Sequence, residues 1–297
     1  MHSVEAQVTG EAAGGATGGA AGGRSAAGRL RALLAAAHPA PSFAVTAVAT
    51  VLAAAGGRGA AGCPLVALSV LAGQLSVGWC NDRVDLRRDL AAGRADKPLV
   101  TGTVRPHAVA VAAGGALALC VPLSLANGLL AGGAHLVGVG AAWAYNLGVK
   151  RTVLSWLPYA VAFALLPAFV TLGLPGRPWP AAWAMAAGAL LGTGAHAANV
   201  LPDIADDLGT GVRGLPQRLG PGRARVLAAG PLLAASAVLV FGPPGPVGVA
   251  GWVALAVTGA LTPAVVLVPR GRLPFLATLA LAGLDVGLLL LRGARPA

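Results

Sequence analysis

The chain has 297 residues, of which 56% are hydrophobic and 10% are charged, and its formal net charge is +11. A mean hydropathy of +0.76 excludes an ordinary soluble domain and indicates an integral membrane protein. The positive charge does not indicate nucleic-acid binding, because the basic residues lie at the ends of apolar stretches rather than on one soluble face.

The elements follow in chain order from a Gly/Ala-rich beginning. Residues 1–27 lack an apolar core, so we expect a disordered tail rather than a signal peptide. Residues 28–43 are expected to form an interfacial amphipathic helix, with His38 and Pro39 marking the bend where it enters the membrane.

A membrane-spanning helix needs about 20 apolar residues. Nine stretches meet this requirement, near 40–57, 62–82, 106–126, 129–147, 153–173, 180–201, 225–242, 246–268 and 273–291. Residues 28–297 are therefore predicted to form a single all-α domain, a bundle of about nine transmembrane helices.

The basic residues predict the orientation of this bundle. With the N-terminus in the cytoplasm, 17 of the 21 Lys and Arg residues fall in the tail and in loops on the cytoplasmic side. Because positive residues accumulate on that side, we expect a multi-pass protein of the cell membrane with a cytoplasmic N-terminus. Anionic membrane lipids are expected partners of these residues. The three cysteines, Cys63, Cys80 and Cys120, have no metal-ligand spacing and are expected to be packing residues.

Two polar segments repeat at an offset of 118 residues, NDRVDLRRD from Asn81 and NVLPDIADD from Asn199. With the residues that follow, both read N-x3-D-x3-D-x3-G-x4-P-x3-G, and seven of the ten acidic residues lie in or beside them. The segments after them, LAAGRADKPLVTGTVRP and LGTGVRGLPQRLGPGRA, are too polar to span the membrane. We expect each to form a short helix and loop over the cytoplasmic mouth of the bundle, as lids often do.

A spacing of four places the polar residues of each motif on one face of a helix. These residues are Asn81, Asp85 and Asp89 in the first motif and Asn199, Asp203 and Asp207 in the second. Two acidic faces at the ends of membrane helices repel each other unless a cation lies between them. Mg²⁺ commonly uses one or two carboxylates together with substrate phosphates, so the pattern predicts Mg²⁺ and a phosphorylated ligand between facing clusters. Asp82 and Asp206 break the symmetry and are candidates for additional ligands or supporting contacts.

Nearby basic and phenolic side chains are candidates to bind the phosphates. Arg94 and Lys97 follow the first motif, and Tyr145 and Lys150 lie in YNLGVKRT at the cytoplasmic end of the fourth span. Lysine and arginine stabilise charge on a departing phosphate group without protonating it. The alternative for Lys150 and Arg151 is that they merely follow the positive-inside rule.

Several stretches carry a resemblance to a known family. NDRVDLRRD followed by GRADKPLVTG is similar to an NDxxDxxxD signature, DIADD to a second DxxxD motif, and YNLGVK to a Tyr/Lys element. These are motifs of the UbiA superfamily of intramembrane prenyltransferases, which the chain resembles over about residues 28–292. The resemblance implies a helical bundle around a central cavity, with a cytoplasmic cap over both Asp-rich motifs. Lys97 stands where many members have arginine, so a point charge replaces a two-pronged phosphate contact.

The resemblance also implies an activity, the Mg²⁺-dependent ionisation of a prenyl diphosphate. We expect transfer of the prenyl group to a lipophilic acceptor in the membrane, with an aromatic compound as the first candidate and a tetrapyrrole or a lipid alcohol as alternatives. By this resemblance, the residues that would hold the Mg²⁺–diphosphate are Asn81, Asp85, Asp89, Asp203 and Asp207. The resemblance assigns the phosphates to Arg94, Lys97 and Lys150, and we add Asn199 and Tyr145 to the substrate-binding set. The catalytic set is Asp85, Asp89, Asp203, Asp207 and Lys150. Aromatic faces either shield the prenyl carbocation or only pack; the candidates are Tyr145, Trp156, Tyr159 and Phe163.

Two other functions remain as alternatives. A terpene cyclase would use the same ionisation without an external acceptor. A secondary transporter also has internal repeats, but its sites usually lie near the bilayer midplane, whereas these motifs lie at the cytoplasmic ends of their spans. Asp285 in the last span and His196 before the second motif are further candidates, with a structural role as the alternative for both.

Overall fold

The computed structural model describes residues 25–268 and 273–292, and no strand occurs within these ranges. Residues 1–24 of the predicted tail lie outside the described residues. The nine predicted apolar stretches each coincide with a helix. These helices are α2 (Pro39–Ala55), α3 (Gly62–Ala91), α4 (Pro106–Leu125), α5 (Leu129–Leu147), α6 (Leu157–Thr171), α7 (Ala182–Val200), α9 (Leu215–Phe241), α10 (Val249–Leu267) and α11 (Leu273–Arg292).

Four shorter elements connect or precede these helices. They are α1 (Ala26–Ala35), the 3₁₀ helices η1 (Val149–Arg151) and η2 (Leu201–Asp203), and α8 (Ile204–Gly209). The bend expected at His38 and Pro39 is present, because α1 and α2 meet there at 68°. His38 adopts a left-handed conformation with φ 52°, and Pro39 is the first residue of α2, a position that needs no backbone donor.

Length and composition qualify fewer than nine helices as membrane spans. Among the described residues, α3, α4, α9 and α10 are long and apolar enough, and α1 with α2 forms a fifth candidate if the bent pair counts as one span. Helix α6 has 15 residues and is about 22 Å long. That length is less than the roughly 30 Å of hydrocarbon in a bilayer. Nine spans therefore remain a prediction, while four or five are supported by the helices themselves.

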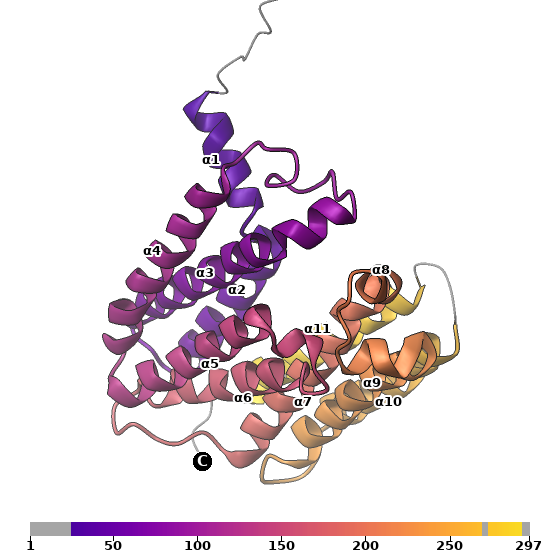
Figure 1. Ribbon diagram of the computed structural model, residues 1–297. Coiled ribbons are helices and arrows are strands. Elements are labelled where there is room, and N and C mark those ends of the chain that lie inside the picture. Colours follow the sequence, from indigo (N-terminus) through magenta and orange to yellow (C-terminus); the bar gives the residue numbers. More distant parts are fainter. Residues whose placement is uncertain (1–24, 269–272, 293–297) are drawn as a thin grey trace, which may run out of the picture.

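The helices pack side by side in a ring that α11 closes by contacting α2 (Figure 1). Helix α3 packs against α2, α4 and α5, while α7 packs against α6 and α9, and α11 contacts both α9 and α2. Glycines allow the closest of these contacts. Gly188 and Gly192 of α7 lie against the backbone of Phe163 and Tyr159 in α6, where an added Cβ would come within 2.4 and 2.3 Å of carbonyl oxygens. This is the small-xxx-small pattern of membrane helix pairs.

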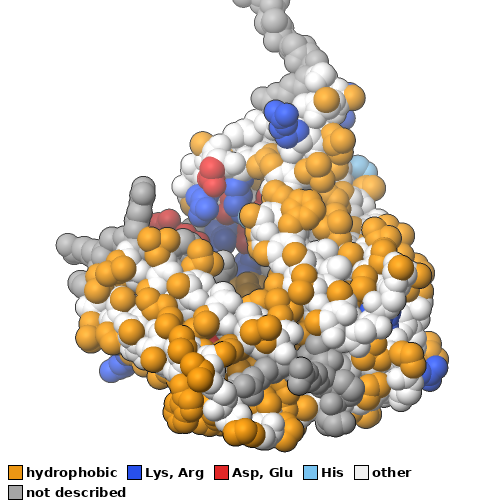
Figure 2. All heavy atoms as spheres, turned by 180° about the vertical axis from the view of Figure 1, so that it is seen from behind, with side chains coloured by type: hydrophobic (Ala, Val, Ile, Leu, Met, Phe, Trp, Pro, Cys, Tyr) orange, Lys and Arg blue, Asp and Glu red, His pale blue; other side chains and the backbone are white. Residues whose placement is uncertain are grey.

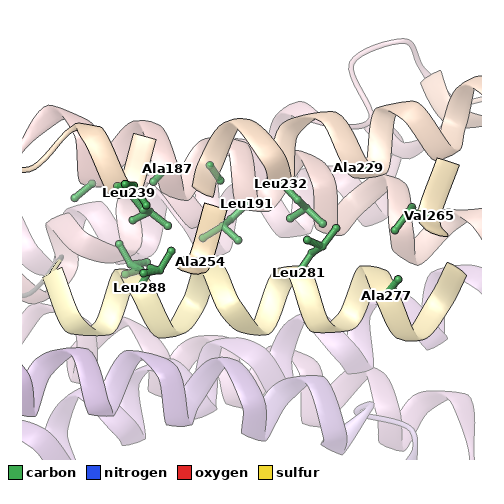
Figure 3. Close-up of a cluster of buried hydrophobic side chains, with 14 residues drawn as sticks. Ala187, Leu191, Ala229, Leu232, Leu239, Ala254, Val265, Ala277, Leu281 and Leu288 are labelled. Carbon is green, nitrogen blue, oxygen red and sulfur yellow. The ribbon is translucent and has the colours of Figure 1, made fainter. Parts of the chain in front are cut away.

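Apolar side chains cover the outside of the bundle as well as its interior. Figure 2 shows hydrophobic side chains over much of the surface. Leu129 and Val249 are 79% and 80% exposed. Contiguous apolar surface on this scale suits contact with lipid. Inside, leucines of α7, α9 and α11 interdigitate, among them Leu191, Leu232 and Leu281 (Figure 3).

Both Asp-rich motifs lie at one end of the bundle. Helix α3 has 30 residues and is about 45 Å long, so its last eleven residues, 81–91, project beyond its apolar part. These residues carry the first motif. The second motif begins in α7 and continues through η2 into α8, which faces the end of α3 in Figure 1.

Candidate functional site

The first motif lies on one continuous helix, as its spacing predicts. Asp82, Asp85 and Asp89 are 2%, 2% and 3% exposed at the end of α3, whereas Asn81 is half-buried. Three carboxylates this deeply buried require compensating partners.

The second motif does not form one helix face, and this part of the prediction is wrong. Asn199 lies in α7, Asp203 in η2 and Asp207 in α8. Pro202 explains the break, because proline has no N–H to continue the hydrogen bonds of α7. Asn199 is consequently exposed, while Asp203 and Asp207 are half-buried.

The shared glycines have a common structural role. Gly93 and Gly211 have φ values of 64° and 82°, in the left-handed region that favours glycine. Directly after each glycine, the backbone N–H turns back to the last aspartate of the motif. Arg94 N donates to Asp89 O at 3.0 Å, and Val212 N donates to Asp207 O at 2.8 Å. Both motifs therefore end in the same glycine-terminated turn of the chain.

A cleft lies between the two motifs. Its lining includes Asp89 and Arg94 from the first motif region and Asp203, Asp206 and Asp207 from the second, together with Arg88, Ala92 and Thr210. Figure 2 shows acidic and basic side chains together in a hollow of the otherwise largely apolar surface. Asn81 and Asn199 are not among the residues that line this cleft.

Two cations compensate Asp85. Lys150 Nζ lies 2.5 Å from Asp85 Oδ1, and Arg88 Nη2 lies 3.0 Å from Asp85 Oδ2. The other arm of Arg88 reaches the second motif, with Nη1 3.0 Å from Asp207 Oδ1. Arg88 therefore joins the two motifs directly.

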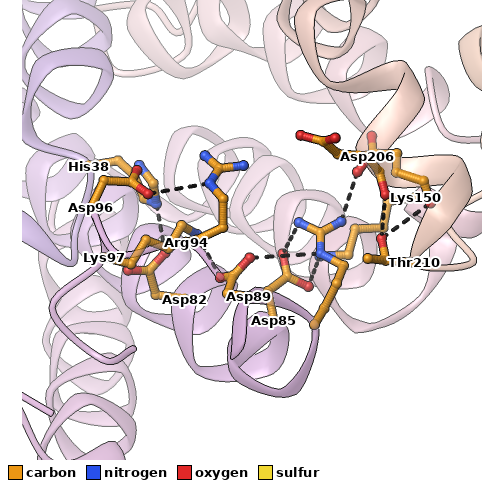
Figure 4. Close-up of polar contacts among 12 residues, drawn as sticks. His38, Asp82, Asp85, Asp89, Arg94, Asp96, Lys97, Lys150, Asp206 and Thr210 are labelled. Atoms are coloured by element: carbon orange, nitrogen blue, oxygen red, sulfur yellow. Dashed lines mark hydrogen bonds and ion pairs between the residues drawn. The ribbon is translucent and has the colours of Figure 1, made fainter. Parts of the chain in front are cut away.

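A second group of contacts anchors the loop after α3. Lys97 Nζ lies 2.9 Å from both Asp82 Oδ1 and Asp89 Oδ2, and His38 Nε2 lies 2.8 Å from Asp82 Oδ1 (Figure 4). Burial alone would lower the pKa of Lys97, but its hydrogen bonds to these two carboxylates raise the pKa above its ordinary value. Lys97 is therefore a fully charged residue held between two acids of the first motif.

The remaining charged groups of the cleft differ in their surroundings. Burial raises the pKa of Asp207, although Gln217 Nε2 donates to Asp207 Oδ2 at 2.8 Å and Arg88 also favours the charged form. Burial lowers the pKa of Lys150 despite the attraction of Asp85. Arg94 pairs at the rim with exposed Asp96, at 3.4 Å.

Aromatic side chains form the next layer behind the cleft. Tyr145 contacts Tyr159 edge-on, with ring centroids 5.2 Å apart, and both lie within 5.6 Å of His196. Trp156 does not join these ring contacts, and Phe163 lines a separate apolar cavity.

The apolar cavity lies between α2, α3, α5 and α6. Val70, Gln74 and Val77 of α3 line it together with Ala134 and His135 of α5. Gln74 precedes Asp85 by eleven residues, about three helical turns, so both lie on one face of α3 about 16 Å apart. The cavity is therefore placed along the same helix face as the first motif.

The acid groups suit a hard cation by their chemistry. Carboxylates of both motifs line one cleft, and the ion pairs among the described residues do not involve Asp203 or Asp206. Mg²⁺ prefers such oxygen ligands. Within residues 25–268 and 273–292, however, no three His, Cys, Asp or Glu side chains are close enough to hold an ion. Arginine and lysine nitrogens neutralise Asp82, Asp85, Asp89 and Asp207 instead.

Three contacting residues were not among the sequence candidates, namely Arg88, Gln217 and His38 as a partner of Asp82. Arg88 lies within the first motif, three residues after Asp85, and on a helix this spacing indicates an ion pair between the two side chains. Of the secondary candidates, His196 forms a hydrogen bond with Ser155 at 3.1 Å.

Asp285 lies away from the cleft, among α9, α10 and α11. It accepts a hydrogen bond from Ser236, which also contacts Thr258 at 3.1 Å. A hydroxyl partner is one of the structural roles expected for an ionisable group in a span.

Comparisons with known proteins agree with this architecture. The profile of the UbiA prenyltransferase family matches residues 40–285. A UbiA homologue from Archaeoglobus fulgidus, bound to GPP and Mg²⁺, is 18% identical with a TM-score of 0.66 over 86% of this chain and 97% of its own. The same homologue bound to Cd²⁺ is 15% identical with a TM-score of 0.62, over 88% of this chain and 98% of its own.

A structure of digeranylgeranylglyceryl phosphate synthase is also similar. It is 13% identical with a TM-score of 0.62, over 90% of this chain and 98% of its own. No curated protein sequence matches the chain. The chain belongs to the UbiA prenyltransferase family, and its apolar helices make it an integral membrane protein.

Proposed function

We propose that the protein is a Mg²⁺-dependent prenyltransferase that moves a prenyl group from its diphosphate to a lipophilic, aromatic acceptor within the membrane. The observation that carries this proposal is the cleft that brings carboxylates of both motifs together, with Lys97 and Lys150 behind them. The A. fulgidus homologue, of the same fold, binds GPP or DMAPP with Mg²⁺.

The proposed roles follow from position and chemistry. Asp89, Asp203 and Asp207 line the cleft, and we assign them with Asp85 and Asn81 to the metal–diphosphate. When bound, Mg²⁺ would neutralise diphosphate charge and so favour departure of the leaving group. Asn199 is exposed in this structure, so its role in substrate binding requires a shift of the α7 end.

The basic residues are proposed to bind the departing diphosphate. Arg94 lies at the rim, Lys97 is held between acids of the first motif, and Lys150 lies at the back against Asp85. They donate hydrogen bonds to phosphate oxygens as the C1–O bond breaks, and both bonding electrons leave with the diphosphate. Tyr145 lies behind this group, where its ring and that of Tyr159 face the developing carbocation.

The hydrocarbon tail is proposed to lie in the apolar cavity beside α3 and α5. That cavity excludes water from the carbocation until an acceptor carbon attacks C1 and then loses its proton. The cavity is lined mostly by aliphatic and aromatic side chains, among them Val70, Val77 and Phe163, which suit a hydrocarbon tail.

The proposal includes a single domain over residues 28–297 with nine spans in the cell membrane. The motif end of the bundle faces the cytoplasm, as does the N-terminus, because the basic residues concentrate on that side. The segments after α3 and α8 form a cap over the cleft.

Diphosphate release tests the function directly. The purified protein in detergent is given Mg²⁺ and prenyl diphosphates of graded length, with and without aromatic acceptors. Release that requires an acceptor supports transfer, release without acceptor indicates a cyclase, and the absence of release favours transport.

Motif variants give the sharper test. Asp85→Ala and Asp203→Ala are expected to abolish turnover in protein that still elutes as a folded monodisperse species. Arg83→Ala, which changes an exposed residue near the same end of α3, is the control and keeps its activity. Near-normal turnover in either motif variant would count against the proposal.

A further inference from the structure

Arg88 lies between the two motifs, where the motif spacing predicted a metal ion. Its guanidinium lies between the motifs, 3.0 Å from Asp85 Oδ2 and 3.0 Å from Asp207 Oδ1. Its Nε lies 3.9 Å from Asp89 Oδ1, so one side chain faces three motif carboxylates. Arg88 is 23% exposed, which leaves it room to move toward the cleft.

Each oxygen of the two carboxylates that Arg88 bridges already accepts a hydrogen bond in this arrangement. Asp85 Oδ1 accepts from Lys150 at 2.5 Å, and Asp207 Oδ2 accepts from Gln217 at 2.8 Å. Arg88 takes the remaining oxygen of each. A divalent cation that binds both carboxylates from the cleft must therefore displace the guanidinium or lie beside it.

A bare divalent cation gains little from this exchange. It would lie close to a unit positive charge in a partly buried site, where like charges repel strongly. A diphosphate changes the balance, because its oxygens accept the two parallel N–H groups that a guanidinium offers. The displaced Arg88 then has a new anionic partner, and Asp85 and Asp207 would be available to hold the metal.

We propose that Arg88 is a resident counter-ion that makes metal binding conditional on diphosphate. The inference rests on the proposed function, since it concerns the same metal and the same phosphates. In the absence of substrate, Arg88 neutralises Asp85 and Asp207 and keeps the ends of α3 and α8 together. When metal and diphosphate arrive together, Arg88 moves from the carboxylates to the phosphate oxygens.

The chain provides a matched control for the test. Arg87 is the neighbouring residue on α3, is exposed, and carries the same charge. R88Q and R87Q therefore remove one unit of charge from adjacent positions, but only R88Q removes the bridge. R88K keeps the charge and loses the two-armed geometry.

The measurement is Mn²⁺ binding to the purified full chain in detergent, by electron paramagnetic resonance, with and without inorganic diphosphate. Wild type and R87Q are expected to bind Mn²⁺ weakly alone and much more tightly with diphosphate. R88Q is expected to bind Mn²⁺ alone roughly tenfold more tightly, because a positive charge beside the ion is gone. Diphosphate should then add less to the affinity of R88Q than to that of wild type.

A gain in metal affinity separates this role from a structural one, since a damaged site binds metal more weakly. Equal Mn²⁺ affinities of R88Q and wild type without diphosphate would overturn the inference, as would an equal effect of diphosphate on both. If R88Q does not fold, R88M, which also removes the charge, decides, with tighter Mn²⁺ binding alone than wild type expected and unchanged binding overturning the inference. R88K, which keeps the charge, is expected to bind Mn²⁺ alone as weakly as wild type does. Failure of wild type to bind Mn²⁺ even with diphosphate would instead refute the proposed function.

Discussion

The pair formed by Lys150 and Asp85 gives the most direct prediction about the cleft. Lys150 is 4% exposed and Asp85 is 2% exposed, and their charged atoms are 2.5 Å apart. Removing one partner of a buried pair costs about 3–5 kcal/mol because the other charge stays buried. Asp85 keeps Arg88 at 3.0 Å, so Lys150→Met is expected to cost about 3 kcal/mol, the lower end of that range.

Activity should respond differently from stability. Loss of one donor to a leaving group typically lowers kcat by about 10²–10³, and we expect that loss for Lys150→Met. Adding Asp85→Asn removes the buried charge that Lys150 had helped to neutralise, so the double variant should recover most of the lost stability. It should remain inactive, because Asp85 is a proposed metal ligand.

The assays are thermal unfolding in detergent at one fixed scan rate and the initial rate of diphosphate release. Arg151→Met removes the exposed neighbouring charge and is expected to leave both quantities unchanged. A Lys150→Met protein as stable as wild type would refute the reasoning about burial. A double variant less stable than either single variant would refute the reasoning about the pair.

Three further predictions concern the cavity, the turn and the metal. Ala134 and Ala142 line the cavity eight residues apart on α5, which is about 12 Å along the helix axis. In a donor-competition assay, Ala134→Phe should exclude only long prenyl donors, whereas Ala142→Phe should hinder short ones as well. Gly211 has a positive φ, so Gly211→Ala should lower the free energy of unfolding by about 1–2 kcal/mol. Gly209→Ala, at the end of α8, should not lower it, and thermal unfolding of both variants gives the comparison. Chelation should stop diphosphate release reversibly, and Mg²⁺ should raise the melting temperature only when diphosphate is present.

Each of these three predictions would be refuted by a specific result. Equal effects of the two phenylalanine variants on all donors would show that the tail does not extend along α5. A stable Gly211→Ala protein would show that the turn can relax without a left-handed residue. Undiminished release in the presence of chelator would remove the metal from the mechanism.

Hydropathy predicted the helices well because each one is a single apolar stretch bounded by turns. Length and composition by themselves qualify four or five of these helices as membrane spans, and α6 has only 15 residues, so the number nine stays a prediction. The pairing of Gly188 and Gly192 with α6 was not predictable. A small-residue pattern identifies a close contact but not the partner helix.

The site was predicted in composition rather than in arrangement. The duplicated spacing led to two equal helix faces, yet Pro202 was visible in the second motif and breaks it. The ion pair of Arg88 with Asp207 joins residues 119 positions apart. Only the fold brings such residues together, so the sequence alone suggested a metal ion at the place where the structure has an arginine.

The repeated motif can be explained by the turn that ends each of its two copies. Asn81 is half-buried and Asn199 exposed, and the first acids lie on a straight helix while the second lie on three elements. The turn after Gly93 and Gly211 is the feature that both copies share atom for atom, with the chain returning to the carbonyl of the preceding aspartate. Each turn directs the following polar segment back toward the cleft. The repeat therefore preserves how each segment leaves its helix, and the differences before the turn leave the first acids buried beside lysines while Asp203 and Asp207 are half-buried at the cleft.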